Sequence, residues 1–447
     1  MSEVVSKERT RNYVRQIKGA VLYKAVAMAA SFLAIPLMIR YLGQEQFGVW
    51  STLLAVMSWI VFFDLGIGNG LRNKVAEALA KNEKTEAASF IASGYSLIGL
   101  IALILWVLIS AASFFIPWQT VFNIQVISES TLRLTVQISV FFILLNFWVG
   151  LIGALIGAVQ KTSLTALGQL ISNVLALVLV YILTKVGVAS ISKLAIVYGI
   201  SLVFANALLS LWFYQLHPEL RPKPYLDKQH VRPLLSVGLQ FFTIQLAVLI
   251  IFTTDKMMIT QLFGPKYVTQ YDVIFKFFSV ITFAHSLITV PLWSAYTDAF
   301  HRNDIVWIKH MMHKQIIIFG GVVMAVGIMI VMAKPVIELW IGGELEVSIP
   351  LVITMGLLVI FSTWNNIYGL ILGGIGKIRF GAIYTIFTAL LNIPLSYFMA
   401  VNLGFGVVGI ALGTLVSISI SSIISPIQVY YFIYAKSKTR LLEGILR

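Results

Sequence analysis

Long hydrophobic segments separated by short polar ones make up almost the whole chain. A helix needs about 20 predominantly apolar residues to cross the hydrocarbon core of a bilayer. Segments of that kind are expected at 17–40, 47–68, 88–116, 132–157, 164–184, 194–215, 234–262, 268–295, 315–333, 348–373, 380–401 and 405–434. The pattern therefore predicts an all-α integral membrane protein with about twelve transmembrane helices.

Composition supports this prediction and removes several classes of soluble protein. Of the 447 residues, 59% are hydrophobic and only 11% are charged, whereas soluble domains carry about 25% charged residues. The net charge of +14 is explained by basic cytoplasmic loops, so no nucleic-acid partner is expected. Cysteine is absent, which excludes a disulfide framework and thiolate metal sites. The basic N-terminus runs into the first span without an A-x-A site, and we interpret it as a leader rather than a cleaved signal peptide.

The distribution of Lys and Arg predicts the orientation of the helices. With the N-terminus inside, 23 of the 32 basic residues lie in cytoplasmic segments and five lie outside. Those five are Arg40, Lys185, Lys193, Lys266 and Lys334. Cytoplasmic loops of membrane proteins carry an excess of Lys and Arg, so both termini are expected in the cytoplasm.

An internal repeat predicts two six-helix lobes. A shift of 221 positions places 77–83 on 298–304 and Gly43 on Gly264, and a shift of 216 places 148–161 on 364–377. These matches occur in the same order in both halves, which indicates duplication. We expect an N-terminal lobe at 1–216, a cytoplasmic linker at 217–233 and a C-terminal lobe at 234–447. Two parallel repeats of this kind are typical of transporters that alternate access to a central site.

Several basic residues are expected at or near membrane depth, where an ionisable group is costly unless it has a function or a partner. Lys24 and Lys256 lie too deep to reach the interface easily, which favours a functional role. Arg40 and Arg133 lie near span ends and could extend to the interface. Lys276 shares a helix face with Asp272 at i,i+4 spacing, so a structural ion pair is the alternative there. A cavity lined by such cations suits an anionic headgroup.

Acidic residues and one histidine form a second set of candidates. Asp64 and Asp255 lie within or beside predicted spans, and His285 is expected in mid-span at the position that the 221 shift aligns with Asp64. These three residues are candidates for gating or ion coupling, because carboxylates and imidazole can exchange a proton or bind a cation. For His285 the alternative is an ordinary packing residue.

Sequence motifs for enzymatic chemistry are missing. The chain has no G-x-x-x-x-G-K-[ST], H-E-x-x-H or G-x-S-x-G motif, and no soluble segment is long enough for a nucleotide site. A transporter is therefore favoured over an enzyme. No cofactor is expected, although H⁺ or Na⁺ could serve as a coupling ion.

The two halves also resemble a known family. IPLMIRYLGQEQFGVW at 35–50 and FFDLGIGNGLRNKVAEA at 62–78 resemble the start of Wzx-type O-antigen flippases, the polysaccharide-transporter branch of the MOP superfamily. TTDKMMITQLFGPKYVTQYDVIFK at 253–276 and PLWSAYTDAFHRND at 291–304 resemble second-half signatures of that family. After about residue 380 the sequence is that of a generic hydrophobic helix.

The resemblance implies a V-shaped flippase of the bacterial inner membrane. Its substrate would be an undecaprenyl-diphosphate-linked oligosaccharide, an O-antigen or related repeat unit for lipopolysaccharide biosynthesis, moved to the periplasmic leaflet. Membrane lipid, a polysaccharide polymerase and a chain-length regulator would be its partners. Lys24, Lys256, Lys276, Arg40 and Arg133 would line a cationic cavity for the diphosphate.

Three other functions stay open at this stage. One of them, a scaffold for the polysaccharide assembly complex, could coexist with transport. An ion-coupled drug or metabolite exporter of the same superfamily would share the two-lobed architecture. A membrane glycan polymerase is an enzyme of a different class, against which the short loops and the duplication argue.

Overall fold

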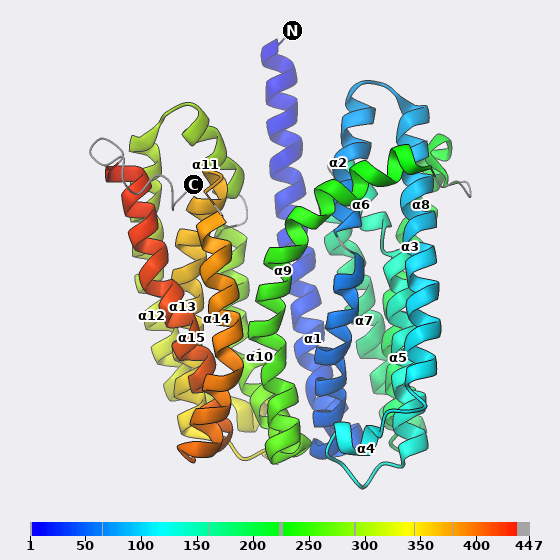
Figure 1. Ribbon diagram of the computed structural model, residues 1–447, viewed down its shortest axis with the longest axis vertical. Coiled ribbons are helices and arrows are strands. Elements are labelled where there is room, and N and C mark those ends of the chain that lie inside the picture. The colour runs from blue at the N-terminus through cyan, green and yellow to red at the C-terminus, as the bar shows by residue number, and fades with distance from the viewer. Residues whose placement is uncertain are drawn as a thin grey trace. The chain divides into compact units, whose positions relative to one another are not determined.

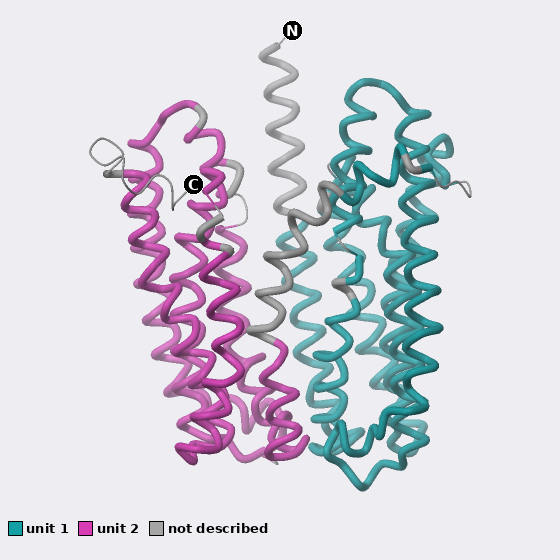
Figure 2. Tube along the Cα trace, viewed as in Figure 1, with its two compact units in different colours: residues 1–245 teal, residues 246–447 magenta. Residues whose placement is uncertain are grey.

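The computed structural model describes residues 2–64, 66–159, 161–222, 227–289, 292–343, 345–377 and 379–435, and these residues are helical apart from short turns and loops. The chain divides into two compact units, residues 1–245 and 246–447 (Figure 2). The division falls inside one long helix, α9 (Lys228–Phe263). The predicted lobes 1–216 and 234–447 with a linker at 217–233 stay a prediction.

Unit 1 contains a bundle of long helices joined by short ones (Figure 1). The elements before α9 are α1 (Ser2–Ile60), η1 (Val61–Asp64), α2 (Ile67–Ala80), α3 (Lys84–Ala112), α4 (Trp118–Val121), α5 (Glu129–Val149), α6 (Ile152–Ala158), α7 (Thr162–Val186), α8 (Ile191–Leu216) and η2 (Pro218–Leu220). Ile67, Leu71, Ile91, Leu155 and Phe213 are among the apolar residues that pack α2, α3, α6 and α8 together.

Unit 2 has the same kind of construction. After the C-terminal part of α9 it comprises α10 (Pro265–Thr289), α11 (Leu292–His301), α12 (Ile305–Ile341), α13 (Ile349–Gly374), α14 (Arg379–Tyr397), η3 (Phe398–Asn402), α15 (Gly406–Tyr430) and η4 (Tyr431–Ala435). Tyr296, Ile308, Ile371 and Val429 belong to a core that joins α11, α12, α13 and α15. Gly413 lets α15 approach α14 closely, because a Cβ there would meet the backbone of Ser396 at 2.4 Å.

Ten helices among the described residues are long and apolar enough to span a membrane. The first candidate, Gly19–Ile60, has 42 residues, about twice the length that a bilayer requires. It contains Gly43, whose φ of 76° is not helical. The predicted span at 234–262 lies in α9, where the side chains of 236–252 are outside the described residues. The protein is therefore an all-helical, multi-pass membrane protein.

Two glycines in left-handed conformations end the first long helical arm of each unit. The backbone of α1 is not helical at Gly43, which divides α1 into two helical arms. Gly264 has φ 99° and separates α9 from α10. A side chain is strained in this backbone region, whereas glycine is not. The two positions are related by the shift of 221 that the sequence predicts, so the same turn chemistry recurs in both units.

Candidate functional site

Asp255 lies at the centre of a buried hydrogen-bond cluster inside unit 2. The residue belongs to α9 and is only 1% exposed. Tyr271 of α10 donates its hydroxyl to Oδ2 at 2.6 Å, and the hydroxyl of Thr414 on α15 lies 2.9 Å from the same oxygen. Asn392 of α14 donates its amide to the Thr414 oxygen at 2.8 Å. One carboxylate therefore connects four helices of the same unit.

The cluster contains more hydrogen-bond acceptors than donors. A carboxylate can accept about four hydrogen bonds, while only two hydroxyl donors reach Asp255 in these contacts. The Oδ1 atom of Asn392 is buried without a partner among the described residues. A buried carboxylate that lacks a full set of donors can be stabilised by a proton or a small cation. The arrangement is thus suited to ion coupling, the role that the sequence suggests for Asp255.

Lys256, the next residue on α9, forms an ion pair with Asp272 of α10. The Nζ–Oδ1 distance is 2.5 Å, and the two side chains are 18% and 7% exposed. The i,i+4 spacing in the sequence leaves a pair of Asp272 with Lys276 as an alternative, and the structure places Lys256 against this carboxylate. Lys276 lies one turn further along α10 and is half-buried. In this conformation the charge of Lys256 is compensated by Asp272.

Three other predicted basic residues lie in unit 1, at separate places. Lys24 and Arg40 are exposed on the first arm of α1, about 24 Å apart along a helix that rises 1.5 Å per residue. A single diphosphate cannot contact both. Arg40 borders a cavity of about 390 Å³ together with Tyr41 and Lys185.

Arg133 occupies a third place, in the first turns of α5. It donates through Nε to the Ser113 carbonyl at 3.2 Å and lies 3.6 Å from Glu129. Its guanidinium also lies over the ring of Phe114, 5.4 Å from the centroid. These contacts tie the start of α5 to the end of α3, which is a structural role that the residue already fulfils.

Asp64 borders a cavity of about 460 Å³ in unit 1, which we call the unit 1 cavity. Its lining includes Asp64, Asn69, Arg72, Asn146, Gly153 and Thr165. Asp64 accepts the backbone N–H of Gly66 at 2.6 Å, and Asn146 accepts from the amide of Asn206 at 2.8 Å. The unit 1 cavity therefore contains both a carboxylate and a guanidinium.

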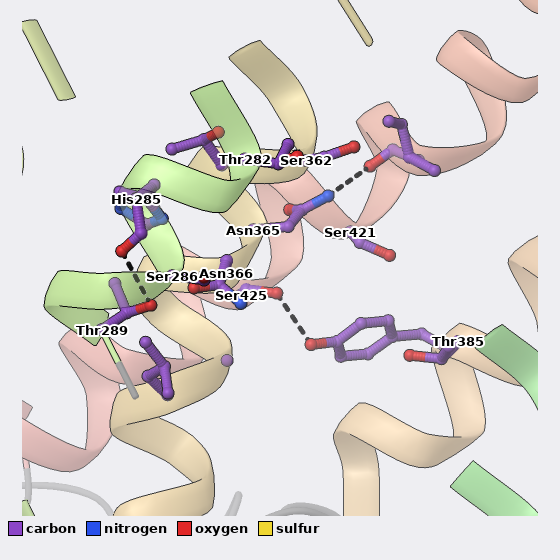
Figure 3. A pocket seen from close by; sticks show the side chains of 15 residues that line it. Thr282, His285, Ser286, Thr289, Ser362, Asn365, Asn366, Thr385, Ser421 and Ser425 are labelled. Atoms are coloured by element: carbon purple, nitrogen blue, oxygen red, sulfur yellow. Dashed lines mark hydrogen bonds between the residues drawn. The ribbon is translucent and has the colours of Figure 1, made fainter. Parts of the chain in front are cut away.

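His285 borders a cavity of about 520 Å³ in unit 2, which we call the unit 2 cavity and which Figure 3 shows with its fifteen lining residues. Side chains from α10, α13, α14 and α15 converge on it. His285 itself is 5% exposed. The described lining holds no Asp, Glu, Lys or Arg, so this cavity is polar without being charged.

The two cavities occupy corresponding positions of the repeat. The shift of 221 takes Asp64 to His285 and Gly68 to Thr289. The shift of 216 takes Asn146 to Ser362, Phe147 to Thr363, Gly150 to Asn366, Gly153 to Gly369 and Ala154 to Leu370. Each first residue lines the unit 1 cavity and each second residue lines the unit 2 cavity. The alignment of His285 with Asp64 thus has a structural counterpart.

Sequence reasoning missed the polar residues after residue 380. The hydroxyl of Thr414, the amide of Asn392 and the lining residues Tyr384, Thr385 and Ser425 all belong to segments interpreted as generic hydrophobic helix. A signal was present in α15, where Thr414, Ser417, Ser421, Ser425 and Gln428 recur at spacings of three and four. That spacing places them on one helix face.

Comparison with known proteins extends these observations. A family model described as "Polysaccharide biosynthesis protein" matches residues 18–295. The "Putative O-antigen transporter" of Salmonella typhimurium (strain LT2) is 23% identical over 412 residues, which cover 90% of this chain and 92% of that protein. The "Putative O-antigen export protein" of Yersinia pseudotuberculosis is also 23% identical, with coverage of 89% and 91%.

Solved structures show the same fold. An inward-facing multidrug resistance MATE family transporter of the MOP superfamily superposes with a TM-score of 0.78 at 14% identity, covering 94% of this chain and 99% of that one. A MOP superfamily transporter from Pyrococcus furiosus gives a TM-score of 0.64 at 14% identity, with coverage of 95% and 96%. At these identities the likeness establishes a MATE/MOP-like fold. The prediction of a transporter rather than an enzyme is confirmed by the family and its relatives. Because the family model matches more than half of the chain, this protein belongs to the polysaccharide biosynthesis protein family.

Proposed function

We propose that the protein is a flippase for an undecaprenyl-diphosphate-linked oligosaccharide. It would carry an O-antigen or related repeat unit from the cytoplasmic to the periplasmic leaflet of the bacterial inner membrane, without making or breaking a bond. The observation that carries this proposal is the match to relatives named as O-antigen transport and export proteins, which extends over about nine-tenths of this chain.

The proposed architecture has twelve spans in two six-helix halves, 1–216 and 234–447, with a cytoplasmic linker at 217–233 and both termini in the cytoplasm. The interruption of α1 at Gly43 supports counting α1 as two spans. The length of α9, 36 residues, supports a span in its C-terminal part. Alternating access by a V-shaped pair of halves, as the family resemblance implies, would move the headgroup across the membrane.

Basic side chains would contact the diphosphate in this mechanism, because charge-assisted bonds to phosphate are strong in surroundings of low dielectric. Lys24 and Arg40 are exposed, so a headgroup could reach either of them, although one diphosphate cannot contact both at once. Lys256 and Lys276 would contribute from unit 2, Lys256 after its pair with Asp272 opens. Arg133 already has structural partners, so its contribution to binding would be smaller.

Ion coupling would act through the buried carboxylate of Asp255. H⁺ or Na⁺ is the proposed coupling ion, and Asp64 is a second candidate in unit 1. The same buried carboxylate, together with the fold likeness to multidrug transporters, favours one alternative function. That alternative is an ion-coupled exporter of drugs or metabolites. A polysaccharide polymerase and a chain-length regulator are proposed partners only if the flippase function holds.

Complementation tests the proposed function. The chromosomal gene is deleted, this gene is supplied on a plasmid, and surface polysaccharide and lipid-linked repeat units are measured by leaflet. We expect the deletion to strand repeat units on the cytoplasmic side and the plasmid to restore export and long-chain glycan. A gene inactivated by a frameshift is the control.

Two other outcomes would contradict the proposal. Unpolymerised repeat units in the periplasmic leaflet of the deletion strain would point to a polymerase. Unchanged surface glycan together with a changed drug susceptibility would point to the exporter.

A further inference from the structure

The unit 2 cavity has the size and polarity of a small-molecule site. Its volume of about 520 Å³ falls within the range of ~300–1,000 Å³ that is typical of ligand pockets. Its described lining carries hydroxyl groups of Ser, Thr and Tyr, the amides of Asn365 and Asn366, and the imidazole of His285. All of these come from one unit, and Figure 3 shows them gathered from separate helices.

Three polar atoms around this cavity are buried without a hydrogen-bond partner among the described residues. They are Nε2 of His285, Oγ1 of Thr363 and Oδ1 of Asn365. His285 is 5% exposed and Thr363 is 2% exposed. Buried polar groups are nearly always paired, because leaving one unpaired is costly. Three such atoms on one cavity indicate a ligand that supplies the missing partners.

The hydrogen bonds already present show what kind of partner is missing. Asn365 donates its amide to the Ile418 carbonyl at 3.1 Å, which leaves its oxygen to accept. Thr289 donates to the His285 carbonyl at 3.1 Å, as helical Ser and Thr often do, which also leaves an accepting oxygen. Both oxygens therefore remain able to accept, and a matching ligand must donate hydrogen bonds to them.

Charge narrows the choice of ligand further. A phosphate group needs donors and positive charge, and the described lining has no Lys or Arg. A cation in surroundings of low dielectric needs an opposite charge, and the described lining has no Asp or Glu. An apolar ligand would leave the buried acceptors unpaired. A neutral molecule with many hydroxyl groups satisfies each requirement, because every hydroxyl donates one hydrogen bond and can accept two.

We propose that the unit 2 cavity binds a sugar residue of the transported oligosaccharide through hydroxyl donors. This inference rests on the proposed flippase function and assigns the sugar and the diphosphate to different parts of the protein. His285 and Thr363 are then sugar contacts from α10 and α13. For His285 this is a binding role in place of the coupling role that the sequence suggests.

Gly369 offers a way to fill the cavity without disturbing the fold. It lines the cavity on α13, and a Cβ atom built there meets nothing within 4 Å. Gly369→Leu therefore places a side chain in space that the sugar would occupy. Gly327 on α12 is equally open and lies outside the lining, so Gly327→Leu is the matched control.

Thr363→Val is a second variant that preserves the shape of the side chain. The Thr363 hydroxyl has no partner among the described residues, so its removal should leave stability unchanged or raise it. A sugar contact at this oxygen would be lost, and a net hydrogen-bond contribution of about 1 kcal/mol corresponds to about fivefold weaker binding. Lower affinity at undiminished stability is a result that a purely structural role would not give.

The experiment measures binding of two lipids to the purified protein by microscale thermophoresis. One is the undecaprenyl-diphosphate-linked repeat unit from a polymerase-deficient strain, and the other is undecaprenyl diphosphate without sugar. We expect the wild type and Gly327→Leu to prefer the sugar-bearing lipid. Gly369→Leu should lose that preference, and Thr363→Val should reduce it about fivefold. Binding of the sugar-free lipid should be the same in all four proteins.

Each other outcome would overturn the inference in a recognisable way. If both cavity variants keep the wild-type preference, the sugar binds elsewhere. If they instead lose binding of radioactive Na⁺, the cavity is a cation site. A wild type that complements the deletion but binds both lipids equally keeps the flippase function and loses this site. A wild type that binds neither lipid and fails to complement refutes the proposed function, and the inference with it.

Discussion

The two units place charge in opposite locations. In unit 1 the cavity is charged, with Asp64 and Arg72 in its lining, whereas the corresponding unit 2 cavity has no charged residue among those described. In the helices on either side of the glycine turns, the charged residues lie in unit 2 and not in unit 1. The unit 2 residues Asp255, Lys256, Tyr271 and Asp272 correspond, by the shift of 221, to the buried unit 1 residues Ala34, Ile35, Trp50 and Ser51.

This comparison separates what a repeat preserves from what it can change. The glycine turn is present in both units, at Gly43 and at Gly264. Both units also have a cavity lined by a glycine at the same repeat position, Gly153 in unit 1 and Gly369 in unit 2. These features depend on backbone conformation and on the absence of a side chain. The ionisable groups that line the cavities or lie buried in the long helices do not recur. An ionisable group is costly at membrane depth, so we expect one only in the unit where it has a function or a partner. The two units can therefore have different functions.

The largest expected effect comes from breaking the Lys256–Asp272 pair on one side. Lys256→Met leaves the carboxylate of Asp272, which is 7% exposed, without its lysine. Removing one partner of a buried pair costs about 3–5 kcal/mol. We expect about 3 kcal/mol, because Lys256 retains some contact with solvent. Unfolding by urea in detergent, followed by circular dichroism, measures the loss.

The matched control transplants the unit 1 residues. Lys256→Ile with Asp272→Ser removes both charges and restores the pair found at Ile35 and Ser51. Replacing both members of a buried pair by uncharged residues often changes stability little. The free energy of unfolding of this double variant should therefore lie within about 1 kcal/mol of the wild-type value. If the single variant is as stable as the double variant, the carboxylate of Asp272 does not depend on Lys256 for compensation of its charge.

A second prediction concerns Asp255, which has Ala34 as its unit 1 counterpart. Asp255→Asn keeps an oxygen that can accept from Tyr271 but removes the charge that a coupling ion would neutralise. We expect folding to be maintained and gradient-driven flipping in proteoliposomes to fall about tenfold, within the usual range of coupling energies. Asp298→Asn, which changes an exposed carboxylate of the same unit, is the control. A variant at Asp255 that responds to Na⁺ and pH gradients like the wild type would exclude coupling there.

The smallest effect is expected at the repeated surface ion pairs. Glu77 on α2 accepts from Lys74 and Lys81 at 2.9 Å each, and these bonds lower the pKa of Glu77 to about 2. Its unit 2 counterpart Asp298 accepts from Arg302 at 3.0 Å. Because the carboxyl pKa is lower in the folded state than its ordinary value of 4.5, ionisation of Glu77 stabilises the folded state at pH values above 4.5. That contribution is lost as the pH falls from 4.5 towards 2.

Thermal unfolding of Glu77→Gln tests this pair. Exposed ion pairs contribute little and are screened by salt. We therefore expect a small decrease in Tm at pH 7, a smaller one in high salt, and none at the acidic end of a pH series. A decrease that persists at low pH would mean that Glu77 acts through packing rather than through charge.

Sequence patterns predicted the membrane class, the repeat and the identity of the ionisable candidates. The length and hydrophobicity of the segments were enough to predict membrane-spanning helices, because a span must be long and apolar whatever it packs against. The partners of the candidates were less predictable. Asp255 could be named from the sequence, but Tyr271, Asn392 and Thr414 could not, since uncharged polar residues at membrane depth are common and carry a weak signal. The same holds for Thr363 and Asn365 of the unit 2 cavity.

The sequence by itself thus determined that the chain crosses a membrane many times, because that property follows from local hydrophobicity. It also predicted that the two halves repeat, from motifs and glycines that recur in the same order. The tertiary structure alone decided that Lys256 is compensated by Asp272 and that four helices meet at Asp255. It also decided that repeat-related positions enclose one charged and one neutral cavity. The physical reason is that hydrogen bonds and cavities depend on which helix faces pack together, and residues as far apart in the chain as 255 and 414 come into contact only when they do.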